Sequence, residues 1–289
     1  MAVKLKTYTF LAVAIASLMV DAAIAQSTVV VYDLKFRKDT IVLTNPNILT
    51  TGSYSNAVFH PSDTLLFFTA SELGNLNILY YDGFQTEFLT ACKGCTDLAV
   101  TSDGKGLSVL QKRDGGTVDL VKYPLVNTSP AVLMPSVAFT DYAWVDDNSL
   151  VALFPGNPNQ LKLLSIRPRK ETPIAQNVGE DLQRFYTTPS VTFIHRQSFN
   201  FSTVKRISAT DGRIDVVIDS EPEQSVFTWT PGGILISTDG SSLFSFNPKK
   251  EHDWKAVRIE DTPPLKGITS LSVNHAGDRL VLTVKEVGQ

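Results

Sequence analysis

Short apolar runs alternate with polar turns along the chain, and one unit of two runs recurs. In this unit an apolar run ends in a bulky residue, a polar turn that usually contains Pro, Asp or Gly follows, and a second apolar run comes next. The bulky residues of the six copies are Phe59, Val100, Trp144, Tyr186, Trp229 and Val273. Their spacings of 41, 44, 42, 43 and 44 residues are typical of propeller blades, which are four-stranded units of about 40–50 residues.

The rest of each unit supplies two further strands. Leu76–Tyr81 and Phe84–Leu89 flank Asp82-Gly83, and Asp-Gly between apolar runs indicates a hairpin because glycine accepts the positive φ of a tight turn. Beyond residue 25, no stretch keeps the 3.6-residue apolar period of an amphipathic helix. We therefore predict an all-β fold, a six-bladed β-propeller of four-stranded blades.

The sixth unit is incomplete, because only five residues follow its second apolar run, Leu280–Val284. Two apolar runs that belong to no copy of the unit lie near the start, Val29–Phe36 and Thr40–Leu43. A half-built blade would leave strand edges exposed. We expect these two runs to complete the last blade and close the ring, so that residues 26–289 form a single domain.

The first 25 residues have the pattern of a secretory signal peptide. Lys4 and Lys6 precede an apolar run, Phe10–Val20, and Ala23-Ile24-Ala25 fits a small-x-small cleavage site. The alternative is a membrane anchor, but a spanning helix needs about 20 apolar residues and this run has 11. We predict that residues 1–25 are a signal peptide, that the mature chain does not span a membrane, and that the protein is periplasmic or secreted.

Cys92 and Cys95 are the only two cysteines, and Lys93-Gly94 separates them. In an oxidising compartment the default for such a pair is a local structural disulfide. Free thiols, or a redox or metal role, are the alternatives. A c-type haem site would need His after the second Cys, where Thr96 stands, and a zinc site would need two more ligands at metal-like spacing.

The polar turns resemble the Trp-Ser-Pro-Asp-Gly-Lys repeat of WD40-like (PD40) propellers. The likeness is carried by three turns, Phe59-His60-Pro61-Ser62, Thr101-Ser102-Asp103-Gly104-Lys105 and Trp229-Thr230-Pro231-Gly232-Gly233. This repeat occurs in the C-terminal domain of periplasmic TolB and in the propeller domains of oligopeptidases. The resemblance implies a TolB-like six-bladed propeller. It implies no activity, because the additional α/β domain of TolB and the hydrolase domain of oligopeptidases have no counterpart here.

Composition and motifs narrow the function further. A net charge of −3 without a basic stripe argues against a nucleic-acid partner. The chain has no Gly-x-Ser-x-Gly elbow, no phosphate loop, no His-Glu-x-x-His and no EF-hand loop. Each of the four histidines, His60, His195, His252 and His275, stands alone in the sequence, without the neighbouring groups that nucleophilic catalysis requires. We predict no catalytic residue, no cofactor and no metal.

Binding residues are expected at one mouth of the central channel. Loops before the innermost strands and loops between the second and third strands should form this mouth. The candidates that they carry are Lys93, Asp97, Arg113, Asp141, Tyr142, Gln183, Arg196, Glu223, Asp239 and Lys266. Other six-bladed propellers include lactonases, which gather Glu, Asn and Asp side chains around calcium in the channel. Carboxylates stand at strand ends here as well, namely Glu72, Asp97, Asp141, Asp181 and Glu223. No local spacing marks a metal site, so solvated loop charge is the favoured interpretation.

These observations favour an exported, monomeric propeller without enzymatic activity, which acts as a binding or scaffold module for another protein or a cell-envelope component. The alternative hypothesis is a lactonase-like, calcium-dependent hydrolase with its site in the central channel.

Overall fold

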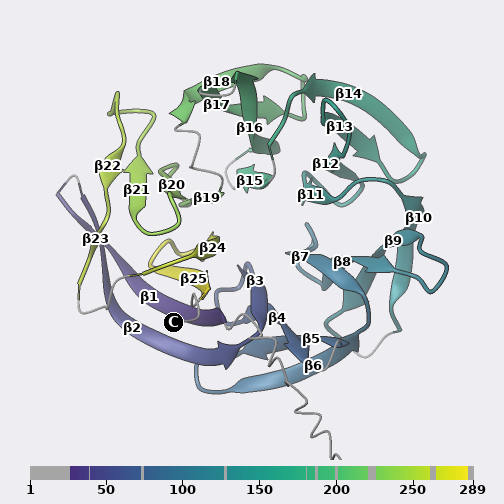
Figure 1. Cartoon of the computed structure of the whole chain (residues 1–289), viewed down its shortest axis with the longest axis horizontal. Coiled ribbons are helices and arrows are strands. Elements are labelled where there is room, and N and C mark those ends of the chain that lie inside the picture. Colours follow the sequence, from purple (N-terminus) through teal and green to yellow (C-terminus); the bar gives the residue numbers. More distant parts are fainter. Residues whose placement is uncertain are drawn as a thin grey trace, which may run out of the picture.

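The computed structural model describes residues 27–38, 40–72, 75–126, 129–179, 181–185, 188–198, 201–220, 226–260 and 265–285. These residues contain strands and turns and no helix. The strands form six sheets that stand around a central axis as the blades of a propeller (Figure 1). The prediction of an all-β, six-bladed propeller is confirmed. The predicted signal peptide, residues 1–25, lies outside the described residues.

Blades 1 to 5 are antiparallel meanders whose first strand lies nearest the axis (Figure 1). Blade 1 consists of β3 (Tyr54–Phe59), β4 (Leu66–Glu72), β5 (Asn75–Tyr81) and β6 (Thr86–Cys92). Blade 2 consists of β7 (Cys95–Val100), β8 (Gly106–Lys112), β9 (Val118–Pro124) and β10 (Ala131–Val137). Blade 3 consists of β11 (Asp141–Trp144), β12 (Ser149–Phe154), β13 (Gln160–Ser165) and β14 (Lys170–Gln176). Blade 4 consists of β15 (Gln183–Phe185), β16 (Ser190–Ser198), β17 (Phe201–Ser208) and β18 (Ile214–Ser220). Blade 5 consists of β19 (Val226–Trp229), β20 (Leu235–Thr238), β21 (Leu243–Phe246) and β22 (Lys255–Ala256).

Blade 6 joins the two ends of the described chain. Its inner strands are β24 (Ile268–Val273) and β25 (Arg279–Lys285), and its outer strands are β1 (Ser27–Arg37) and β2 (Thr40–Gly52). β1 pairs with β25 from Ser27 opposite Lys285 to Asp33 opposite Arg279, and with β2 on its other edge. The predicted closure of the ring by N-terminal strands is confirmed, since both edges of β1 are paired.

A short fifth strand, β23 (Arg258–Ile259), adds in parallel to the outer edge of β2. The same segment leaves blade 5 at β22 and reaches blade 6 two residues later. Val257 packs into the core between these two blades, and Glu260 forms ion pairs with Arg37 and Arg258. This crossing segment ties blade 5 to blade 6, which the spacing of the repeat did not indicate.

The core consists of apolar layers between neighbouring blades. In β12, Leu150 and Ala152 pack against blade 2, whereas Val151 and Leu153 pack against blade 4. Successive side chains of a strand point to opposite faces of the sheet, so a strand between two other blades is apolar at every position. The continuous apolar runs of the sequence therefore reflect blades that are covered on both faces.

In five blades the bulky residue of the repeat is the last residue of the inner strand, and it packs against the preceding blade. Trp229 Nε1 donates to Thr192 Oγ1 at 2.8 Å, and Trp144 Nε1 donates to Ser108 Oγ at 2.8 Å. In blade 4, Phe185 is the last residue of β15 and is buried against Trp229 of the following blade. The place of the bulky residue is held by Arg184, which pairs with Val191 as Trp144 pairs with Leu150. Tyr186, which the spacing assigned to this position, lies outside the described residues.

Candidate functional site: the central channel

The inner strands surround a cavity of about 590 Å³, a size within the range of about 300–1,000 Å³ that ligand sites show. Residues of all six blades line it. Its polar lining consists of Asn56, Asp97, Thr101, Thr140, Asp141, Asp181, Gln183, Arg184, Thr269, Ser270 and Ser272.

Backbone geometry explains part of this polar lining. Asn56 and Asp97 have φ values of 53° and 51°, and each lies where its inner strand bulges against the second strand of the blade. Asn and Asp enter this left-handed region more readily than other residues with a side chain. The strand bulge therefore favours a short polar side chain at these two places whatever the cavity binds.

Two carboxylates link neighbouring blades, and we call Asp141 and Asp181 the carboxylate clasp. Asp141 Oδ2 accepts hydrogen bonds at 3.0 Å from the backbone amides of Asp181 and Leu182, which lead into blade 4. Asp181 Oδ2 accepts at 2.7 Å from the amide of Phe227 in blade 5. Gln183 Nε2 donates to Asp181 Oδ1 at 2.6 Å. The clasp thus joins blades 3, 4 and 5 around the channel.

The pKa values of both clasp carboxyl groups are raised. Burial raises the pKa of Asp141 to about 7, and the negative charges of Asp181 and Asp97 add to the shift. Burial also raises the pKa of Asp181 to about 6, although hydrogen bonds from Gln183 and the Phe227 amide oppose it. Both groups therefore change charge near neutral pH, where an ordinary aspartate is fully ionised.

Tyr142 holds blade 3 against blade 2. Its hydroxyl donates to the backbone oxygen of Asp97 at 3.0 Å and lies 2.8 Å from Ser108 Oγ. Burial raises its pKa well above the ordinary value, so the hydroxyl stays neutral. Tyr142 is therefore a structural hydrogen-bonding residue at the channel wall.

Four of the predicted mouth residues line the cavity together, namely Asp97, Asp141, Tyr142 and Gln183. Three others are engaged elsewhere. Lys93 Nζ lies 3.4 Å from Asp114 Oδ1 at the surface, and Arg113 Nε donates to Asp119 Oδ2 at 2.8 Å. Asp239 accepts hydrogen bonds from the amides of Ser241 and Ser242 and so closes its own turn.

The remaining predicted mouth residues do not line the cavity. Arg196 and Lys266 are exposed. Glu223 lies outside the described residues, so its place relative to the cavity stays a prediction.

Arg184 lines the cavity and was not among the predicted residues. The sequence holds a signal for it once the register of blade 4 is known. Arg184 pairs with Val191 as Trp144 pairs with Leu150. The same place in the other five blades is apolar, namely Phe59, Val100, Trp144, Trp229 and Val273, and Arg184 is the charged residue of this series.

The part of the chain that the structure describes contains no group of three or more His, Cys, Asp or Glu side chains placed to hold a metal ion. The acidic oxygens of the clasp already accept backbone N–H groups. As arranged here, these oxygens fit a role in joining blades better than a calcium site, which takes 6–8 oxygen ligands in typical proteins.

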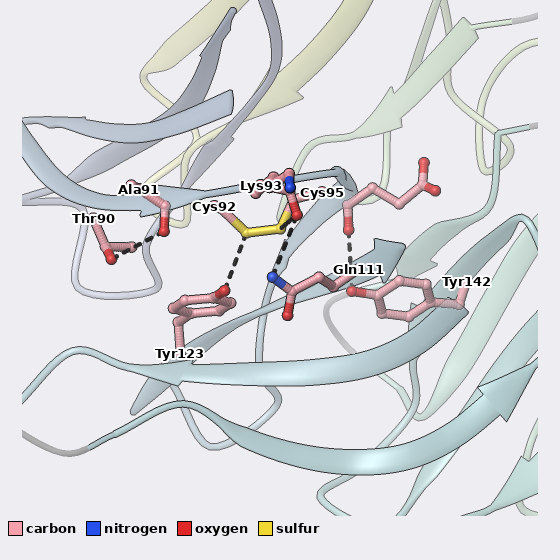
Figure 2. Close-up of a disulfide and its surroundings, with 9 residues drawn as sticks. Thr90, Ala91, Cys92, Lys93, Cys95, Gln111, Tyr123 and Tyr142 are labelled. Carbon is pink, nitrogen blue, oxygen red and sulfur yellow. Dashed lines mark hydrogen bonds between the residues drawn. A yellow bond between two sulfur atoms is a disulfide. The ribbon is translucent and has the colours of Figure 1, made fainter. Parts of the chain in front are cut away.

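Cys92 and Cys95 form a disulfide at the turn from β6 to β7, with Cα atoms 5.6 Å apart. The bond joins the outer strand of blade 1 to the inner strand of blade 2, and Figure 2 shows Tyr123 and Gln111 beside it. Both cysteines are buried, and the hydroxyl of Tyr123 lies 3.3 Å from Cys92 Sγ. The predicted local disulfide is present, and it fixes the turn that leads to Asp97.

We expect Cys92→Ala/Cys95→Ala to lower the free energy of unfolding by about 2 kcal/mol, the chain-entropy value for so short a loop. Urea unfolding of the variant and of the wild type checks this. Wild-type protein unfolded with reductant should approach the variant, because both lack the cross-link. An unchanged unfolding midpoint would show that the turn is held by its hydrogen bonds alone.

No helix among the described residues is long and apolar enough to cross a membrane.

Comparison with known proteins gives structural neighbours only. No family model matches the sequence, and no curated protein matches it. A putative TolB from Agrobacterium tumefaciens is similar in structure, with a TM-score of 0.64 and 12% identity over 91% of this chain and 99% of that chain. A chain of a nidogen/laminin complex has a TM-score of 0.60 and 12% identity, covering 89% of this chain and 98% of that chain.

An enzyme is also among the neighbours. A gluconolactonase from Xanthomonas campestris has a TM-score of 0.59 and 12% identity over 88% of this chain and 95% of that chain. At this level of identity the similarity establishes the propeller fold, and function has to be argued from the site.

Proposed function

We propose that this protein is a non-enzymatic binding module that presents the channel face of its propeller to another protein or a cell-envelope component. The observation that supports the proposal best is the carboxylate clasp. Asp141 and Asp181 use their oxygens to join blades 3, 4 and 5, so the acidic groups of the channel shape its wall. The structure of a nidogen/laminin complex contains a propeller of the same fold, which supports a role of this kind.

The proposed setting is the periplasm or the outside of the cell, with residues 1–25 as signal peptide and residues 26–289 as a monomeric propeller. The buried Cys92–Cys95 disulfide supports this setting, because disulfides persist in oxidising compartments. The likeness of the polar turns to WD40-like repeats and the TolB neighbour support it as well.

The test is photo-crosslinking from the proposed binding face. A crosslinker at Lys266 and another at Lys93 should capture the same partner from the native envelope, because both residues are exposed at predicted mouth loops. Lys170, exposed at the start of the outer strand β14, serves as the control position. Capture from Lys170 at equal yield, or different proteins from the two mouth positions, would contradict the proposal.

The alternative is a calcium-dependent hydrolase of the lactonase type, and the gluconolactonase neighbour is the observation in its favour. Thermal unfolding with and without calcium separates the two functions. The binding module should show the same melting temperature in both conditions. A calcium-dependent rise of several degrees that Asp141→Asn abolishes would support the hydrolase instead.

A further inference from the structure

Arg184 breaks the pattern of the channel wall. Arg184 pairs with Val191 as Trp144 pairs with Leu150, and the residues at this place in the other inner strands are all apolar, namely Phe59, Val100, Trp144, Trp229 and Val273. Apolar side chains at this place pack between blades, whereas arginine brings a cation with five N–H donors. Arg184 lines the cavity of about 590 Å³. Its presence there calls for a reason that packing does not supply.

The guanidinium of Arg184 has an unused donor. Its Nε is buried and has no hydrogen-bond partner among the described residues. Arg37, Arg113 and Arg213, by contrast, each pair with a carboxylate. A buried donor without a partner is costly, and a planar guanidinium fits a carboxylate with two parallel hydrogen bonds. The chemistry of Arg184 therefore matches a carboxylate on a ligand.

The same cavity contains acidic groups. Asp97, Asp141 and Asp181 line it together with Arg184, and they lie close enough that Asp97 and Asp181 raise the pKa of Asp141. A ligand with only a carboxylate would be repelled by these groups. A ligand that also carries a positive charge would find an arginine for its carboxylate and aspartates for its cation in the same lining. Each oxygen of Asp181 accepts one hydrogen bond, from Gln183 or from the Phe227 amide, and has a further lone pair with which to accept from an ammonium.

We propose that the channel binds a small zwitterion, with its carboxylate on Arg184 and its ammonium beside Asp141 and Asp181. The class is that of a free amino acid or of a short peptide with both termini charged, and the cavity volume suits either. This inference goes beyond the proposed function, because it requires no protein partner. A failed crosslinking experiment would leave it standing.

The test is titration of the full-length mature protein followed by the arginine Nε–Hε resonances in NMR. The resonance of Arg184 is assigned by its disappearance in Arg184→Lys. Glycine and triglycine are the probes, and acetate and ethylammonium are controls that carry one charge each. We expect a zwitterion to shift the Arg184 resonance in a saturable way, and each single-charge control to bind at least about tenfold more weakly, because one of the two contacts is missing.

Variants make the result specific. Arg184→Ala should weaken binding of the zwitterion at least about tenfold, and Arg184→Lys should recover part of it because the charge remains. Arg213→Ala, which removes an exposed arginine that does not line the cavity, should bind like the wild type. Saturation by glycine alone indicates a free amino acid, and saturation by triglycine indicates a peptide.

Two outcomes would overturn the inference. One is the absence of any shift of the Arg184 resonance with either zwitterion at about 20 mM. This concentration would detect even a dissociation constant of about 1 mM, which corresponds to a binding free energy of about 4 kcal/mol. The other is equal binding by the wild type and by Arg184→Ala, provided that Arg184→Ala melts at the wild-type temperature. Acetate binding as tightly as glycine would likewise contradict the assignment of the acidic groups to an ammonium.

Discussion

Replacing Trp229 by alanine is expected to lower the free energy of unfolding by about 4 kcal/mol, within the range of about 3–5 kcal/mol for buried aromatic residues. Trp229 is 1% exposed, and its ring centroid lies 4.7 Å from that of Phe185. The substitution opens a cavity between blades 4 and 5. It also leaves Thr192 Oγ1, which accepts from Trp229 Nε1, without this donor. Equilibrium unfolding in urea measures the loss.

Trp254→Ala is the matched control. Trp254 lies before the outermost strand of blade 5, is partly exposed, and donates from Nε1 to the backbone oxygen of Asp219 at 3.2 Å. The same change of residue should cost about 1 kcal/mol there, the value of one hydrogen bond and a partly exposed contact. Trp229→Phe should fall between the two. Equal losses for Trp229→Ala and Trp254→Ala would show that the layer between blades 4 and 5 does not depend on its central ring.

The stability of the ring should increase as the pH falls from 8 to 5. Asp141 and Asp181 have pKa values raised to about 7 and about 6, first of all by burial. Both bind a proton more tightly in the folded protein than in the unfolded chain, where their pKa is about 3.9. Their contribution is therefore complete below about pH 4 and is lost as the pH rises through 6 and 7.

We expect the free energy of unfolding to be higher at pH 5 than at pH 8 by an amount on the order of 3 kcal/mol, since one pKa unit corresponds to about 1.4 kcal/mol. Urea unfolding at several pH values measures it. His195 acts in the opposite direction, because burial and Lys205 lower its pKa. Carboxylates with lowered pKa, such as Asp103 and Asp119, lose their contribution only at lower pH and stay outside this window.

Asp141→Asn isolates the clasp from the other titrating groups. The amide oxygen of asparagine can still accept from the backbone of residues 181 and 182, but the side chain no longer titrates. The variant should show a clearly smaller change between pH 8 and pH 5 than the wild type. If both proteins have the same pH dependence, the acidity of Asp141 does not control the stability of the ring.

The blades could be predicted because each one repeats the same local pattern of apolar strands and polar turns. A strand covered on both faces needs apolar residues at every position, and a turn with positive φ needs Gly, Asp or Asn. β8 and the turn before it show both signals within a few residues, because residues 106–110 are all buried and Gly104 has a φ of 65°. The closure by Val29–Phe36 was also accessible, because a half-built blade has only one pair of unassigned strands to complete it.

The channel was predicted less well because its residues carry no periodic signal. Asp141 and Asp181 are 40 residues apart, and the hydrogen bond between them depends on how two blades are placed. Arg184 was missed because it holds the place of the bulky residue in blade 4, two residues before Tyr186, which the spacing assigned to that place. Arg113 and Asp239 were included because loop charges look alike in sequence, whereas in the structure each one serves a local contact.

The amino-acid sequence by itself determined the all-β class, the number of blades, the closure of the ring and the pairing of Cys92 with Cys95, because these depend on residues close in sequence or on a counted repeat. The tertiary structure alone decided which side chains share the channel, the raised pKa values of the clasp and the unpartnered Nε of Arg184 among the described residues. The physical reason is that burial and charge interaction depend on distances between blades, and those distances are set only when the ring has closed.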